Sequence, residues 1–94
     1  MYFVYIVQCS DGYYYTGVTN NLERRLNEHN SGLVYGFTSK RLPVQLVYSQ
    51  CFQFIEEAIL SEKKLKGWSR KKKEALIKGD FENLKLLSKS KGKK

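Results

Sequence analysis

The sequence is poor in the residues that mark several common protein classes. Its 94 residues include two cysteines, one proline and one histidine, and no long apolar run. Cys9 and Cys51 form no CxxC pair and have no histidine at zinc-site spacing, so we expect two separate thiols in a reducing compartment. No stretch approaches the roughly 18 apolar residues of a membrane-spanning helix, and no basic leader precedes an apolar stretch. These absences predict a cytoplasmic protein with no membrane partner.

Acidic residues are also scarce, above all near the C-terminus. The chain holds 17 Lys and Arg against nine Asp and Glu, a net charge of +8. Residues 1–68 contribute seven basic and six acidic side chains, whereas residues 69–94 contribute ten and three, so the last quarter carries +7. A localised positive region suits a polyanion such as nucleic acid. Without an amphipathic apolar face, binding to a membrane is not expected; for residues 89–94 alone, a solubilising tail is an equal alternative.

Local patterns predict one α+β domain over residues 1–87, followed by a basic, disordered tail over residues 88–94. The expected architecture is a small three-stranded, mainly antiparallel sheet flanked by helices, in the order ββαβαα. Strands are predicted at 3–8, 13–18 and 44–49, and helices at 22–30, 53–67, 70–78 and 81–87. The first strand is apolar on both faces, which favours a central position. Gly17 interrupts the second strand, which often marks close approach by a ligand or another backbone.

An acid occupies a position where the pattern of the 53–67 helix calls for an apolar residue. On a helical wheel, Glu62 falls near the centre of the apolar stripe. That stripe consists of Ile55, Ala58, Ile59 and Leu65. A buried carboxylate must be paired, protonated or bound to a metal. The residues leave two alternatives: an ion pair with Lys66 one turn later, or a divalent cation held at the rim of a cleft.

Four short motifs in a fixed order carry a resemblance to a known family. They are Val4-Tyr5-Ile6, Tyr15-Thr16-Gly17, Asn21-Leu22-x-x-Arg25 and Ala58-x-x-x-Glu62. Each motif alone is a weak signal, but in this order and spacing the chain resembles the GIY-YIG nuclease superfamily over about residues 1–80. The segment LKGWSRKKKEALI, residues 65–77, is similar to the small stand-alone bacterial members of the excision-nuclease-like type. The resemblance implies the GIY-YIG fold.

The resemblance also implies roles for five residues. Tyr5 and Tyr15 would face the reacting phosphate from neighbouring strands, and Arg25 would bind and neutralise it. Glu62 would be the only protein ligand of one Mg²⁺ or Mn²⁺ ion, which favours the metal over the ion pair. His29 falls where several members have His or Tyr, and would share in proton transfer.

The chain departs from the family's pattern at several positions. Val4 replaces the glycine of the first motif and Thr16 the isoleucine of the second, but both variants keep the tyrosine. Val18 stands where repair-type members often have a lysine, so one aid to proton transfer is missing. Asn83 is only a weak match for a distal asparagine seen in some members.

These residues predict the chemistry of phosphodiester hydrolysis. We expect Tyr5 to be the base for the attacking water, because Arg25 and a bound cation would lower the pKa of its phenol. His29 is the helper or the alternative base, and Tyr15 would orient water or hydrogen-bond the phosphate. Further phosphate contacts are expected from Lys40, Arg41, Arg70, Lys71, Lys72 and Lys73.

The predicted function is a metal-dependent endonuclease that hydrolyses phosphodiester bonds in DNA. So short a chain leaves no room for a separate sequence-reading domain, so selectivity for nucleic-acid structure is expected rather than for sequence. A protein partner for targeting is a further expectation, and the sequence does not separate DNA from RNA. The alternative is a nucleic-acid-binding module that kept the fold and lost turnover.

Overall fold

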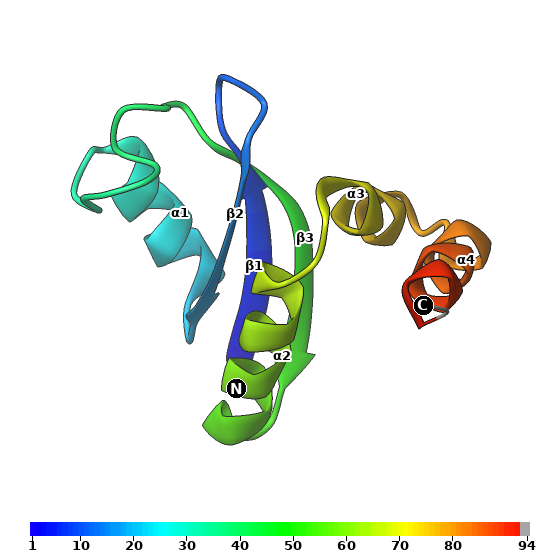
Figure 1. Cartoon of the computed structure of the whole chain (residues 1–94). Helices are drawn as coiled ribbons and strands as arrows, with labels where there is room; N and C mark the ends of the chain where they lie inside the picture. Colours follow the sequence, from blue (N-terminus) through cyan, green and yellow to red (C-terminus); the bar gives the residue numbers. More distant parts are fainter. Residues whose placement is uncertain (93–94) are drawn as a thin grey trace.

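The computed structural model describes residues 1–92 and has the predicted α+β fold. Three antiparallel strands form one sheet in the order β2-β1-β3, so β1 is central as expected. The strands are β1 (Tyr2–Gln8), β2 (Tyr14–Thr19) and β3 (Gln45–Phe52). The helices are α1 (Leu22–Asn30), α2 (Ile55–Lys66), α3 (Arg70–Lys78) and α4 (Phe81–Gly92). In Figure 1, α1 and α2 lie on opposite sides of the sheet.

One face of the sheet is buried by α2. Val4 and Ile6 of β1 are fully buried there and form a cluster with Ala58 and Leu65. Fully burying a side chain of this size stabilises a fold by about 1.5–3 kcal/mol. This cluster therefore fixes α2 across β1, and with it the side on which the Glu62 helix lies.

The other face of β1 carries Tyr5 and Val7, which pack with Leu22 and Leu26 of α1. Alternation along the strand thus sends the motif tyrosine to the α1 side. Gly17 of β2 lies directly across from Tyr5. A Cβ atom at Gly17 would be 2.5 Å from the Tyr5 hydroxyl oxygen, so the partner that approaches this glycine closely is the Tyr5 side chain. The expectation of a ligand or a second backbone at Gly17 is corrected in this respect.

The ends of the helices follow the predicted capping residues. Asn21 accepts a hydrogen bond from the backbone N–H of Arg24 at 3.0 Å, and Ser69 accepts one from the N–H of Lys72 at 3.3 Å. Gly79 ends α3 in the left-handed conformation, with φ of 73°. The bounds of α1 and α3 agree with those expected from the sequence.

The loop between α1 and β3, residues 31–44, is held against the β1–β2 hairpin (Figure 1). The Asn30 side chain accepts from the N–H of Val44 at 2.7 Å and donates to its carbonyl at 3.1 Å. Arg41 pairs with Asp11 of the hairpin at 2.9 Å, and its carbonyl accepts from the N–H of Ser10 at 2.9 Å. These bonds give a polar loop a fixed place beside the sheet.

The C-terminal segment differs from its prediction. A disordered tail was expected from Ser88, but α4 continues through Gly92. No proline or β-branched residue interrupts the sequence of α4, so the helix has no local signal to end at residue 87. Residues 93–94 of the expected tail lie outside the described residues. Within residues 1–92, no helix is both long and apolar enough to cross a membrane.

Candidate active site

Tyr5 is the centre of the candidate site, and two side chains of α1 contact its hydroxyl group. The Nε of Arg25 donates to the Tyr5 oxygen at 3.4 Å, and Nε2 of His29 lies 3.0 Å from the same oxygen. Only 2% of Tyr5 is exposed, and His29 is fully buried. The i, i+4 spacing of the arginine and the histidine on α1 therefore brings both groups to one phenol.

His29 also has a partner on its other ring nitrogen. Nδ1 lies 3.0 Å from Oγ1 of Thr38, which is itself buried. Because Arg25 donates to the Tyr5 oxygen, the Tyr5 hydroxyl hydrogen is free to be donated to Nε2 of His29. Nδ1 then carries the ring hydrogen and donates it to Thr38. This chain of hydrogen bonds satisfies every buried polar group in it.

Burial raises the pKa of the Tyr5 phenol above its usual value, and the neighbouring Arg25 only partly offsets this rise. Arg25 does lower the pKa of Tyr5, as expected, but desolvation of the phenolate outweighs the attraction of one guanidinium. The lower pKa expected from Arg25 and a bound cation together stays a prediction. Burial, with a smaller effect of Arg25, lowers the pKa of His29. The resting site thus holds a neutral phenol beside a neutral imidazole.

Arg25 is the more accessible member of the group, with 34% of its side chain exposed. Its Nη1 donates to a carboxylate oxygen of Glu28 at 3.1 Å, one turn along α1. This pair holds the guanidinium next to Tyr5 and leaves part of its edge open to solvent. Arg25 is therefore placed to meet a phosphate at the surface beside the buried phenol.

Tyr15 of β2 lies on the same face of the sheet as Tyr5. Its ring centroid is 6.5 Å from that of Tyr5 and 5.5 Å from the ring of His29. On its other side it stacks on Phe37 of the 31–44 loop, with centroids 6.2 Å apart and planes inclined by 21°. The two motif tyrosines are thus neighbours, as expected, and Tyr15 connects the centre to the surface loop.

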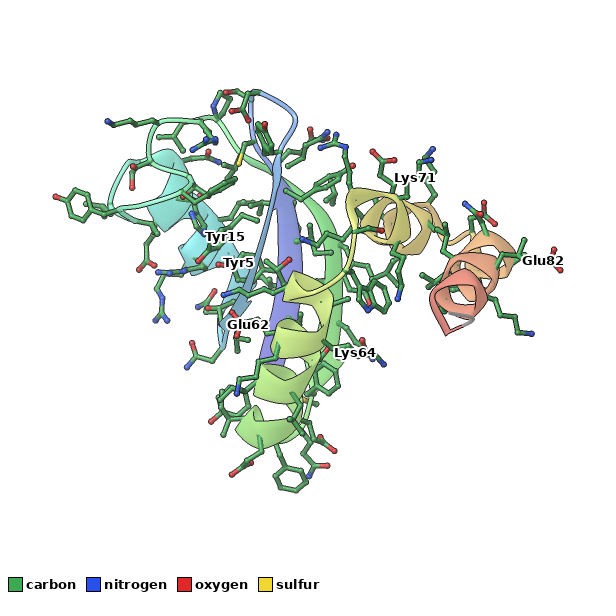
Figure 2. The ribbon with its side chains drawn as sticks, in the orientation of Figure 1. Tyr5, Tyr15, Glu62, Lys64, Lys71 and Glu82 are labelled. Atoms are coloured by element: carbon green, nitrogen blue, oxygen red, sulfur yellow. The ribbon has the colours of Figure 1, made fainter. Side chains whose placement is uncertain are left out.

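Glu62 is the fifth predicted site residue, and it lies on α2, the helix that packs on the opposite face of the sheet from α1. Figure 2 shows Tyr5, Tyr15 and Glu62 close together beside β2. Burial is the main cause of the raised pKa of Tyr5, and the nearby carboxylate of Glu62 adds to the rise. The carboxylate therefore lies near the phenol, and residues distant in sequence share one region.

The environment of Glu62 corrects the helical-wheel argument. The buried face of α2 is centred on Ala58 and Leu65, while 42% of Ile59 is exposed. Glu62 consequently lies at the margin of the buried face, with 21% of its side chain exposed, and pairs with Lys66 at 3.1 Å. The ion pair weighed at the outset is present, and the carboxylate is not buried alone.

A single divalent cation fits this carboxylate chemically. Mg²⁺ keeps several of its waters and is commonly held by one or two carboxylates together with substrate phosphates. Within residues 1–92 there is no cluster of three or more His, Cys, Asp or Glu side chains that could enclose a metal. Glu62 is partly exposed and near Tyr5, so it suits an open site in which one carboxylate, water molecules and a substrate phosphate bind the ion.

The space next to these groups is shallow. A gap of about 160 Å³ lies against Tyr5 and Arg25, lined also by Leu22, Leu26 and Leu46. It is too narrow for a water molecule and is not lined by Glu62. The solvent pocket expected at this point is therefore not formed by this gap, although the side chains of Arg25 and Glu62 are each partly exposed.

The predicted phosphate contacts of the 31–44 loop differ from each other. Arg41 is engaged within the protein: it pairs with Asp11, donates to the Phe37 carbonyl at 2.8 Å and lies over the Phe37 ring at 4.2 Å. Lys40 is exposed. Arg41 therefore anchors the loop, while Lys40 is open to a ligand.

The basic turn of α3 is also less uniform than its sequence suggests. Arg70 pairs with Glu74 and lies over the Tyr14 ring, and Lys72 lies over Trp68. Lys73 is half-buried, and burial, with the nearby charge of Lys66, lowers its pKa. Lys71 is exposed and, in Figure 2, lies on α3 away from Tyr5. All four remain predicted DNA contacts, of which Lys71 has the most open position.

Three residues at the site were missed by the sequence reasoning. Glu28 could have been found from its i, i+3 spacing to Arg25. Thr38 and Phe37 could not, because nothing in a polar loop marks which side chain turns inward to a histidine or stacks on a tyrosine. Their positions depend on how the loop is held by Asn30 and Arg41.

The sequence is similar to those of known proteins. Residues 1–75 match the family described as the GIY-YIG catalytic domain. A UPF0213 protein of Bacillus pumilus is 43% identical over 76 residues, covering 81% of this chain and 78% of that protein. A UPF0213 protein of Halobacterium salinarum is 45% identical over 77 residues, covering 82% and 100%.

Solved structures give the same result. The solution structure of the UPF0213 protein BH0048 from Bacillus halodurans is 42% identical, with a TM-score of 0.55, and the match covers 83% of this chain and 84% of that one. The solution structure of EF2693 from E. faecalis is 38% identical, with a TM-score of 0.59 and coverage of 85% of both chains.

Proposed function

The chain belongs to the GIY-YIG catalytic domain family, and from that premise we propose that it is a divalent-metal-dependent endonuclease acting on DNA. The observation that supports this proposal most strongly is the Arg25–Tyr5–His29 hydrogen-bonded group with Glu62 near it. Nuclease families need a cation for the phosphate, a proton acceptor for water and a metal ligand. This group supplies all three at one place.

Substrate binding begins at Arg25 in this proposal. Its guanidinium can donate to two phosphate oxygens at once, and its exposed edge lies beside Tyr5. Because so little of Tyr5 is exposed, the reacting phosphate reaches the phenol alongside Arg25. Glu62 would hold a Mg²⁺ or Mn²⁺ ion, and the charge of that ion would stabilise the leaving alkoxide.

Tyr5 receives the proton of the attacking water while it passes its own proton to His29. The water oxygen bonds to phosphorus as the bond to the leaving oxygen breaks, and Nε2 of His29 ends with the extra proton. The ordinary pKa values of the two groups are 10.0 and 6.5, and burial moves them farther apart. Transfer from Tyr5 to His29 in advance would cost at least about 5 kcal/mol, so the two transfers occur together with attack. His29 is fully buried and acts through Tyr5, and Thr38 holds it in the accepting tautomer.

Selectivity is proposed to depend on nucleic-acid structure rather than on sequence. The available cationic side chains, such as Lys40 and Lys71, are suited to phosphates, and phosphate contacts carry no sequence information. Flaps, branches and lesions are the substrate features that we propose it distinguishes.

The test compares matched pairs of variants on nicked, branched and supercoiled DNA, with Mg²⁺, Mn²⁺ or EDTA. Glu62→Gln should abolish cleavage while DNA binding in EDTA is kept. Arg25→Ala should abolish cleavage and weaken DNA binding only by the loss of one phosphate contact. The controls are Arg24→Ala, next to Arg25 but with 59% of its side chain exposed, and Glu57→Gln on the exposed face of α2. Both controls should cleave normally. Salt-sensitive binding without cleavage in any metal would contradict the proposal and support a binding module.

A further inference from the structure

An exposed aromatic surface adjoins the candidate site. The ring of Tyr13 on the hairpin meets Phe37 edge to face at 6.1 Å, and Phe37 stacks on Tyr15 of the centre. Of these side chains, Tyr13 is 55% exposed and Phe37 41% exposed. Two residues before Phe37, the Tyr35 side chain is 89% exposed. We call these three side chains the aromatic platform: Tyr13 and Phe37 are in ring contact, and Tyr35 is included as a neighbour of Phe37 in the same loop.

Two basic residues lie at the platform: Arg41 covers the rings of Phe37 and Tyr13, and Lys40 is exposed beside it. Arg41 lies over the rings of Phe37 and Tyr13, at 4.2 and 5.5 Å from their centroids, and its charge is matched by Asp11. Lys40, the preceding residue, is exposed and adds a positive charge. Exposed apolar patches on a small domain commonly mark binding surfaces, and here Tyr13 and Phe37 are connected to the candidate site through Tyr15.

From this arrangement we propose that the aromatic platform binds unpaired bases of a DNA substrate next to the scissile phosphate. The inference rests on the proposed nuclease function and names its substrate class as DNA with a single-stranded segment, such as a flap. Aromatic side chains beside cationic ones bind single strands because every base has a face that can stack on a ring. Bases in a fully paired duplex are already stacked and have no free face for Tyr13 or Tyr35.

The test is a binding measurement that does not require turnover. Fluorescence anisotropy in EDTA compares a single strand of about 12 nucleotides, a blunt duplex, and the same duplex with a single-stranded flap. The wild-type protein should bind the single strand and the flap more tightly than the blunt duplex at equal salt. Tyr35→Ala and Tyr13→Ala should each weaken binding of the single strand and the flap about 5-fold or more, and leave duplex binding unchanged.

Two controls separate stacking from other effects. Tyr35→Phe keeps the ring and should bind like the wild type, and Phe54→Ala removes a ring of similar exposure, 56%, at the N-cap of α2. An unchanged affinity in both Tyr→Ala variants, or an equal loss on the blunt duplex, would overturn the inference. A platform that serves a protein partner gives the first of these results.

Failure of this inference can be told from failure of the proposed function. A protein that shows the expected binding pattern but cleaves nothing keeps the platform and loses the nuclease. A protein that cleaves DNA, yet binds equally well without these rings, keeps the nuclease and loses the platform.

Discussion

The substitution Gly17→Ala tests how closely β2 must approach the Tyr5 ring. A Cβ atom at this position would lie 2.5 Å from the Tyr5 hydroxyl oxygen, 2.7 Å from Cζ and 3.0 Å from Cε2. Favourable carbon contacts begin near about 3.5 Å, so the ring has to move by roughly 1 Å. The backbone of Gly17 does not have a positive φ, so alanine is tolerated there by the main chain and acts through Tyr5.

The expected magnitude follows from the surroundings of that ring. Forcing an extra methyl group into a packed site costs about 1–3 kcal/mol. Moving the hydroxyl also breaks its 3.0 Å bond to the fully buried His29, and an unsatisfied buried polar group costs about 1–3 kcal/mol. We therefore expect the free energy of unfolding to fall by about 2–5 kcal/mol. Cleavage should fall by about 100-fold or more, because a displaced Tyr5 cannot accept the proton.

Urea unfolding followed by Trp68 fluorescence gives the first quantity, and the initial rate of DNA cleavage gives the second. The matched control is Gly67→Ala at the C-cap of α2, where a new Cβ would be 3.6 Å from the nearest atom, the Lys64 carbonyl oxygen. We expect the control to be neutral or slightly stabilising. If the free energy of unfolding of Gly17→Ala is within about 0.5 kcal/mol of the wild-type value, and the variant cleaves DNA at the same rate, the proposed clash with Tyr5 is refuted.

Three further changes test other parts of the account. His29 is neutral in the folded protein but binds a proton below about pH 6.5 in the unfolded chain. The free energy of unfolding should therefore fall as the pH drops below that value, by up to about 1.4 kcal/mol per pH unit. Urea unfolding should show this loss, and an identical pH dependence in His29→Gln would contradict it. Asn30→Ala removes two hydrogen bonds to the backbone just before β3 and should lower the free energy of unfolding by about 2 kcal/mol. Its control, Asn20→Ala, removes an exposed hydrogen bond and should change the free energy of unfolding by less than about 0.5 kcal/mol. Equal losses in the two variants would contradict a special role of Asn30 in holding the loop. Lys66→Met removes the ammonium 3.1 Å from Glu62, so stability should change by less than about 1 kcal/mol and half-maximal cleavage should need several-fold less Mg²⁺; a need for more Mg²⁺ would contradict a metal at this carboxylate.

Local signals in the sequence were sufficient for the framework. Alternating and 3.6-residue apolar patterns depend on neighbours along the chain, as do the capping residues Asn21, Ser69 and Gly79. The central place of β1 followed from its two apolar faces. The meeting of Tyr5 and Arg25 at one site was expected from the resemblance to the GIY-YIG nucleases and not from the local pattern.

The electrostatics of the site were not predictable in this way. The sign of the Tyr5 pKa shift depends on how much of the ring is buried, and burial is a property of the packed chain. Glu62 lies away from the position predicted on the helical wheel because the buried face of α2 does not include all of its apolar residues, Ile59 being partly exposed. The Thr38–His29 hydrogen bond depends on the path of the 31–44 loop, which Asn30 helps to fix. No periodic pattern in the sequence predicts the path of such a loop.

The most direct measurement is a crystal structure with Mn²⁺ and a phosphorothioate DNA that resists cleavage. The account predicts anomalous density for one Mn²⁺ beside the Glu62 carboxylate, with a single phosphate shared between that ion and the Arg25 guanidinium next to Tyr5. Mn²⁺ density elsewhere, or DNA held at α3 with no phosphate near Arg25, would contradict the claim that these residues act on one phosphodiester.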